Sequence, residues 1–147
     1  GDVTMRSLQR AELPLHHAAR RGNRIATQLL CEPTAAAGLI DAENITGWRP
    51  LHLASLGGHS QVAMTLLRHR ADINSRNTMT GSLTVLHGAI RLGRAETAES
   101  LLDRDAEVDA LDVCGRGALH FAAARADLAS VSLLLRYKAD PMREGHA

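Results

Sequence analysis

The sequence predicts an all-α repeat solenoid, and an internal repetition of 33 to 36 residues supports that prediction. A Leu-His pair occurs four times, and its successive histidines lie 36, 35 and 33 residues apart at His16, His52, His87 and His120. A leucine follows each of them by 14 residues, at Leu30, Leu66, Leu101 and Leu134. Since this internal offset is constant, the variation in length falls in the segments that connect the units.

The first part of each unit predicts a short helix that ends at a glycine. In the first unit this helix begins just after Pro14, because proline suits a first helical turn. Gly22, Gly58 and Gly93 then provide the break, since glycine readily adopts the positive φ that ends a helix. The fourth unit carries Ala126 instead, where a positive φ costs on the order of 1 kcal/mol, so we expect strain or local rearrangement.

A second helix with one apolar stripe follows each break. Its apolar residues stand at i, i+1, i+4 and i+5, which is helical spacing. About three extra residues between Cys31 and Leu39 predict an additional loop, at Glu32 to Gly38, after the second helix of the first unit. The stripes are Val62, Ala63, Leu66 and Leu67 in the second unit, Thr97, Ala98, Leu101 and Leu102 in the third, and Ser130, Val131, Leu134 and Leu135 in the fourth.

Extended segments connect the units through hairpin fingers. The run Ala71-Asp72-Ile73-Asn74 recurs as Ala106-Glu107-Val108-Asp109 and, in part, as Ala139-Asp140-Pro141-Met142. Gly47, Gly81 and Gly115 fit the turns of these hairpins. About two extra residues make the finger at Arg76 to Leu83 longer than the others.

These features together resemble the ankyrin family, whose unit has about 33 residues and a T-P-L-H-x-A signature. The second unit matches best, through Arg49-Pro50-Leu51-His52-Leu53-Ala54, Gly58-His59 and Leu66-Leu67. The resemblance covers about Leu13 to Met142 and implies stacked helix-turn-helix pairs with projecting β-hairpin fingers. It also implies that the signature histidines form structural hydrogen bonds. Only Thr84 keeps the signature threonine, so its hydroxyl contact is expected to be missing from the other three units.

We divide the chain into an N-terminal flank or remnant of a preceding repeat at residues 1–12 and a repeat domain at residues 13–147. The repeats span approximately 13–46, 47–80, 81–113 and 114–147. The last unit keeps apolar residues in its second helix and breaks off at Asp140-Pro141, where another finger would begin. We therefore expect the chain to be an excerpt of a longer array, because terminal repeats need a polar outer face.

Composition narrows the class of partner. Seventeen Lys and Arg against sixteen Asp and Glu give a net charge of +1, which favours neither nucleic acid nor an anionic membrane. No apolar stretch approaches the roughly 20 residues that span a bilayer. The two cysteines fall in different units and predict no disulfide framework, so we expect an intracellular protein, cytoplasmic or nuclear. We expect it to be a monomer by itself.

No pattern predicts catalysis, a metal or a cofactor. The four signature histidines lie on repeats roughly 10 Å apart, whereas zinc needs its ligands about 2 Å from one centre. His59 sits at a predicted turn, and His69 and His146 have no Cys or His at ligand spacing. Cys31 and Cys114 would each need a nearby histidine and an oxyanion site to act as nucleophiles. No glycine-rich nucleotide-binding motif is present, so we predict that the protein is not an enzyme.

The remaining function is to bind another protein, and two surfaces are candidates. At the fingers, Trp48 and Met79 stand outside the helical core pattern, and tryptophan is common in binding hot spots. On the first helices, the family resemblance implies that the residues one, four and five positions after each signature histidine face a concave groove. The groove candidates are Arg20, Arg21, Leu53, Leu56, Arg91, Leu92, Phe121 and Arg125. The alternative is that Trp48 covers a neighbouring finger or helix, that Leu53 and Phe121 pack between repeats, and that the arginines are only solvated.

We therefore predict an interaction module, a scaffold that binds a protein partner through its concave groove and hairpin fingers. One alternative is a regulatory or substrate-recruiting arm of a larger enzyme or channel. Another is an inhibitor that masks a transcription factor. Truncation of Trp48 or Met79 is expected to weaken binding without unfolding, and truncation of His52 to disturb the fold first.

Overall fold

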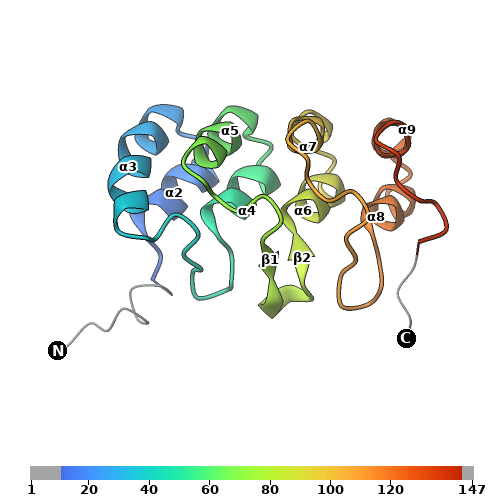
Figure 1. The fold of residues 1–147 in the computed structure, drawn as a ribbon, viewed down its shortest axis with the longest axis horizontal. Coiled ribbons are helices and arrows are strands. Elements are labelled where there is room, and N and C mark those ends of the chain that lie inside the picture. Colours follow the sequence, from blue (N-terminus) through green and yellow to red (C-terminus); the bar gives the residue numbers. More distant parts are fainter. Residues whose placement is uncertain (1–10, 144–147) are drawn as a thin grey trace.

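A computed structural model describes residues 11–143 of the protein as four helix pairs that stand side by side. In Figure 1 the inner helices form one row, the outer helices form a second row above it, and the connecting segments descend below the inner row. The predicted all-α repeat solenoid is confirmed. The inner helices are α2 (Pro14–Arg21), α4 (Pro50–Leu56), α6 (Val85–Arg91) and α8 (Ala118–Ala124), and the outer helices are α3 (Arg24–Ala36), α5 (Ser60–Arg68), α7 (Ala95–Leu102) and α9 (Leu128–Arg136).

The core is a continuous layer of aliphatic side chains between the two rows. Each inner helix contributes a signature leucine, and each outer helix contributes the leucine that recurs 14 residues after the histidine. Leu135 is an exception to the predicted stripe, because it is 46% exposed while Leu133 is buried in its place. The fully buried leucines are Leu15, Leu51, Leu66, Leu86, Leu101 and Leu134.

The inner helices begin as the sequence predicts. Pro14 and Pro50 occupy the first turn of α2 and α4, where the missing proline N–H costs no helical hydrogen bond. The Thr84 hydroxyl accepts a hydrogen bond from His87 N at 3.1 Å and caps α6. No side chain caps the other three inner helices, all of which lie within the described residues.

Two of the signature histidines, His16 and His87, tie one segment of the chain to another. His87 Nδ1 accepts a hydrogen bond from Thr84 N at 3.1 Å, and its Nε2 donates to the Ala110 carbonyl at 2.8 Å. His16 makes the equivalent bonds with Leu13 N and the Ala42 carbonyl. Burial lowers the pKa of both imidazoles, so each side chain is held in its neutral form.

His52 differs from its counterparts. It is 1% exposed, and neither ring nitrogen has a hydrogen-bond partner among the described residues. Its ring instead lies 5.5 Å from the ring of Trp48, measured between centroids. Burial lowers the pKa of His52 to about 4.

The turn after the inner helix has the same backbone geometry in the first unit as in the fourth. Gly22 has φ of 68°, and Ala126 at the corresponding position has φ of 56°. Asn23 N donates to the Ala18 carbonyl, and Asp127 N donates in the same way to Ala122. Of the two expectations for the fourth unit, strain and local rearrangement, the structure supports strain. The unit keeps the turn and holds an alanine in the left-handed region.

Replacing Ala126 with glycine is expected to raise the free energy of unfolding by about 0.5 to 1 kcal/mol. Glycine removes the penalty of about 1 to 2 kcal/mol for an alanine in the left-handed region. Part of this stabilisation is offset because glycine also raises the conformational entropy of the unfolded chain. Urea titration measures the effect. Ala129→Gly is the matched control, because Ala129 is exposed within α9 and glycine there should destabilise by about 1 kcal/mol. If Ala126→Gly and Ala129→Gly destabilise the protein equally, the prediction that Ala126 is strained is wrong.

The extra residues of the first unit extend a helix instead of forming the predicted loop. Helix α3 has 13 residues, whereas α5 has 9, and Pro33 lies inside it. The helix ends at Ala36, and Leu39 N then donates to the Thr34 carbonyl at 2.9 Å. Alanine has the highest helix propensity, which favours continuation through Ala35 and Ala36.

Side chains also join each connecting segment to the next one. Asp72 N donates to the Asp41 carboxylate at 3.1 Å, and Glu107 N donates to Asn74 Oδ1 at 3.0 Å. Asp140 N donates to Asp109 Oδ1 at 2.9 Å. These three contacts form a side-chain ladder along the edge of the stack where the outer helices end and the fingers begin.

Candidate functional site

Each finger is organised by one polar side chain at its start. Asn44 Oδ1 accepts hydrogen bonds from Thr46 N at 3.1 Å and Trp48 N at 2.9 Å. The second and third fingers are organised in the same way by Asn77 and Asp112, whose side chains accept from backbone N–H groups two residues later. Such side-chain turns fix the direction of the residues at the tip.

Only the longer second finger forms a β ladder within residues 11–143. Strand β1 (Arg76–Asn77) pairs antiparallel with β2 (Leu83–Thr84), and the short 3-10 helix η1 (Thr78–Thr80) makes its turn. The first finger closes through a hydrogen bond from Asn44 N to the Trp48 carbonyl at 2.9 Å. The third closes in the same way, from Asp112 N to Arg116 O at 2.8 Å.

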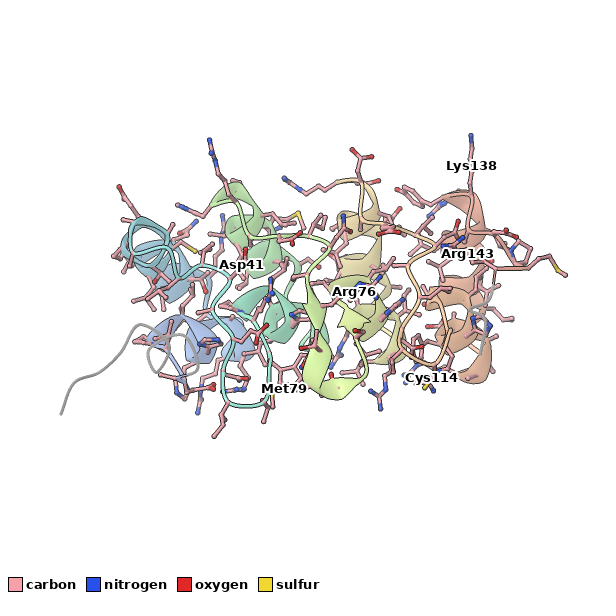
Figure 2. All side chains as sticks on the ribbon, turned by 60° about the horizontal axis from the view of Figure 1, so that its bottom comes forward. Asp41, Arg76, Met79, Cys114, Lys138 and Arg143 are labelled. Atoms are coloured by element: carbon pink, nitrogen blue, oxygen red, sulfur yellow. The ribbon has the colours of Figure 1, made fainter. Side chains whose placement is uncertain are left out.

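Neighbouring fingers are bonded to each other. Asn77 Nδ2 donates to the Thr46 carbonyl at 3.1 Å, which joins the second finger to the first. Val113 N donates to the Gly81 carbonyl at 2.9 Å, which joins the third finger to the second. In Figure 2 Arg76 lies between the second and third fingers, where its guanidinium donates to the carbonyls of Ser82 and Leu111. The fingers therefore form one ordered row.

An apolar side chain is exposed at the tip of each finger. Ile45 is 77% exposed, Met79 is 59% exposed and Val113 is 74% exposed. Figure 2 shows Met79 and Cys114 at the outer ends of their fingers, far from Lys138 on the opposite edge. The tip segments 45–47, 78–82 and 113–115 carry no charged side chain. We call Ile45, Met79 and Val113 the fingertip strip.

Glycines let the members of the fingertip strip lean on the preceding finger. A Cβ on Gly47 would stand 3.1 Å from Met79 Cγ, and one on Gly81 would stand 3.4 Å from a Val113 methyl group. The sequence indicated Met79 but missed Ile45 and Val113. A usable signal was present, because each follows directly after the Asn or Asp that organises its finger.

Trp48 belongs partly to the core. It is half-buried and packs against the core cluster beside His52. Of the two roles considered for it, the structure supports a covering role over α4. A truncation of Trp48 is therefore expected to lower stability as well as to alter the surface, which revises the expectation from sequence.

The apolar groove candidates differ in exposure. Leu53 is 7% exposed and lies in the core, so it offers little surface to a partner. Leu56 is half-buried, and its Cδ2 lies 3.0 Å from where a Cβ on Gly88 would stand. Leu92 is 41% exposed. Phe121 is half-buried, with the Arg116 guanidinium 5.0 Å from its ring centroid.

The four candidate arginines are all exposed. Arg20 pairs with Glu12 at 2.6 Å. Arg125 lies across the turn of the preceding unit, because its Nε is 2.8 Å from where a Cβ on Gly93 would stand. Arg21 and Arg91 have no ion pair among the described residues. The structure thus places all four at the C-terminal ends of inner helices.

The cysteines and histidines show no reactive arrangement. Cys31 is fully buried, and burial raises its thiol pKa to about 11, so the thiol stays protonated at neutral pH. Cys114 is exposed at the third fingertip. Within residues 11–143, no three His, Cys, Asp or Glu side chains are grouped to hold a metal ion, and His146 lies outside this range. No helix in the same range is long and apolar enough to cross a membrane.

Comparison with known proteins gives matches along most of the chain. Residues 2–77 match the family model described as ankyrin repeats (3 copies), and residues 85–135 match ankyrin repeats (many copies). The mouse nuclear factor NF-kappa-B p105 subunit is 32% identical over 131 residues, which cover 88% of this chain and 13% of that protein. The human neurogenic locus notch homolog protein 1 is 36% identical over 126 residues, covering 85% of this chain and 5% of that protein.

A plant protein matches a shorter stretch. The E3 ubiquitin-protein ligase XBAT33 of Arabidopsis thaliana is 39% identical over 87 residues, which cover 58% of this chain and 17% of that protein. The chain therefore spans less than a fifth of the length of each of these relatives.

Proposed function

Because the chain belongs to the ankyrin repeat family, whose repeats are protein-interaction modules, we propose that it binds a protein partner through its fingers and concave groove. The observation that carries this proposal is the fingertip strip. Three exposed apolar side chains, one per finger, stand in a row that bears no charge. Exposed apolar groups gathered in this way mark interaction sites more often than single ones do.

The order of the fingers supports binding as well. Side-chain hydrogen bonds shape every finger, and further bonds join each finger to its neighbour. A surface that is already ordered loses less conformational entropy when a partner docks. Leu56, Leu92 and Phe121 extend the apolar surface onto the inner helices, and their partial exposure supports a place for them in the groove.

The module can serve within a larger protein. The matched stretches make up small parts of the p105 subunit, the notch homolog and the E3 ligase, which favours a regulatory or substrate-recruiting arm. The second alternative is an inhibitor that masks a transcription factor. Both alternatives use the same surface without catalysis or a cofactor. The two free cysteines support an intracellular location.

Polar replacement of the fingertip strip is expected to weaken partner binding at least about tenfold, because apolar anchors dominate interface energies. The variant is Ile45→Ser/Met79→Ser/Val113→Ser, measured by calorimetry with a partner recovered by affinity capture and then purified. Its melting temperature should stay within a few degrees of wild type, since these side chains are exposed.

A matched control separates the fingertips from apolar exposure in general. Ile25→Ser/Leu29→Ser/Leu128→Ser replaces three side chains that are 70%, 73% and 78% exposed on the outer helices. This control is expected to bind like wild type. If the control weakens binding and the fingertip variant does not, the site lies on the outer helices and the proposal is wrong.

A further inference from the structure

The small net charge conceals a strong separation of charge along the repeat. The inner helices and the turns after them, at residues 13–24, 50–59, 85–94 and 118–126, contain six of the seventeen basic residues. None of the sixteen Asp and Glu lies there. These segments therefore carry +6, while the remaining eleven basic and sixteen acidic residues leave −5 for the rest of the chain.

All six basic residues are arginines at one edge of the stack. They occupy the C-terminal ends of the inner helices and the turns that lead into the outer helices, and every one is exposed. Among the described residues, only Arg20 has an ion pair, with Glu12. We call this set the arginine edge, and its members are Arg20, Arg21, Arg24, Arg91, Arg94 and Arg125.

The acidic side chains lie mainly on the other edge. Asp41, Asp72, Asp109 and Asp140 belong to the connecting segments, at the ends of the outer helices where the side-chain ladder runs. They are thus separated from the arginine edge by the length of the helices. Three carboxylates stand beside the arginine edge: Glu12 pairs with Arg20, Asp127 lies near Arg125, and Glu96 lines the same surface as Arg24. Six arginines against three carboxylates leave this edge positive, and such a potential attracts anionic groups.

The arginine side chains cover the turns of three consecutive units. Arg20 and Arg21 belong to the first unit. Arg94 lies over the turn of the second unit, because its Nε donates to the Leu56 carbonyl at 3.0 Å and its Cδ is 2.8 Å from where a Cβ on Gly58 would stand. Arg125 lies in the same way over the turn of the third unit. Because packed helices stand roughly 10 Å apart, this row is about 20 Å long, which an extended peptide spans with about six residues.

We propose that the arginine edge selects an extended partner segment of at least about six residues that carries acidic side chains beside apolar anchors. The inference rests on the proposed function and specifies the chemistry of the partner. The acidic side chains of the partner pair with the arginines, and its apolar anchors contact Leu56, Leu92 and Phe121. Complementary charge at the rim speeds association and suppresses partners of the wrong sign.

A nucleic acid is a poorer match to the same residues. Phosphates suit arginines, but single strands also need aromatic platforms on which bases stack. Phe121 is the only Phe, Tyr or Trp in the inner-helix segments, and Arg116 already lies over its ring. Leu56 and Leu92 beside the arginines suit the apolar side chains of a peptide instead.

Selection from a random peptide library, displayed on phage and panned on the 147-residue chain, tests the proposal. The selected peptides are expected to be enriched in Asp and Glu beside Leu, Ile, Val or Phe. Binding of the most enriched peptide is then measured by fluorescence anisotropy. In Arg21→Gln/Arg91→Gln/Arg125→Gln its dissociation constant is expected to rise about tenfold, since each exposed pair contributes roughly two- to fivefold.

The control variant, Arg68→Gln/Arg104→Gln/Lys138→Gln, removes three exposed cations at the C-terminal ends of the outer helices. It is expected to bind the same peptide within about twofold of wild type, because the charges lie away from the arginine edge. Thermal melting of both variants should match wild type. Added salt should reduce the difference between wild type and the arginine-edge variant, because it screens exposed charges.

Three outcomes overturn the inference in different ways. If the selected peptides are neutral and their binding depends on the fingertip strip, the proposed function stands and the role of the arginines is refuted. Equal binding of acidic peptides to wild type and the arginine-edge variant would do the same. If an oligothymidine strand binds more tightly than the peptide, and the arginine-edge variant no longer binds that strand, the arginine edge is a nucleic-acid site. Selection of no peptide would contradict the proposed function as well.

Discussion

Replacing Leu66 with alanine is expected to lower the free energy of unfolding by about 2 to 5 kcal/mol, the usual range for a buried leucine. Leu66 is fully buried in α5 and belongs to the core between the two rows of helices. The cost is large relative to the total stability of a domain, about 5 to 15 kcal/mol. Urea titration at neutral pH, followed by circular dichroism, measures it.

Leu67→Ala is the matched control for this prediction. The residue follows Leu66 directly in α5 but is only half-buried, so its truncation should cost less than half as much. A loss below about 0.5 kcal/mol for Leu66→Ala would mean that the core stripe is misplaced. Because each repeat contacts only its neighbours, a similar loss is expected from Leu101→Ala in α7.

Acidification from pH 7 to pH 4 is expected to remove about 3 kcal/mol of stability through His52 alone. The pKa of His52 is about 4 in the folded protein, against about 6.5 in the unfolded chain. Between these values the unfolded chain binds a proton that the folded protein does not, so the free energy of unfolding falls as the pH falls. The contribution of His52 is complete above pH 6.5 and is lost as the pH drops to about 4.

Urea titrations of wild type and His52→Leu at several pH values isolate this contribution. The variant is expected to lose about 3 kcal/mol less stability than wild type over the interval, because it takes up no proton at this position. His16 and His87 act in the same direction, since burial also lowers their pKa values. Identical pH profiles for wild type and His52→Leu would contradict the prediction.

The repeat pattern predicted the fold because the residues that define it are the ones that make the structure. The Leu-His pair and the later leucine are buried in the second and third units, whereas Leu30 and Leu119 are half-buried and His120 is exposed. His16 and His87 make the hydrogen bonds that the family resemblance implied. The position of the turn at Ala126 was predictable from the repeat spacing alone, and so was the left-handed strain of an alanine there. That the fourth unit keeps this turn was not predictable, because it depends on packing across the whole unit.

The surface was harder to predict because exposure depends on neighbouring units. Leu53 occupies a groove position by count, yet it is buried in the core. Trp48 lies at a finger by sequence, yet its ring packs toward His52. Ile45 and Val113 are exposed because a side-chain turn directs them outward, and that turn depends on hydrogen bonds between residues two positions apart.

The side-chain ladder at the connecting edge has a mechanical consequence. Asp41, Asn74 and Asp109 each hold a backbone N–H of the following segment, so consecutive units are linked one after another. Tension applied along such a stack is transmitted in series through every link. The force that opens it is therefore set by the weakest junction and does not grow with the number of units.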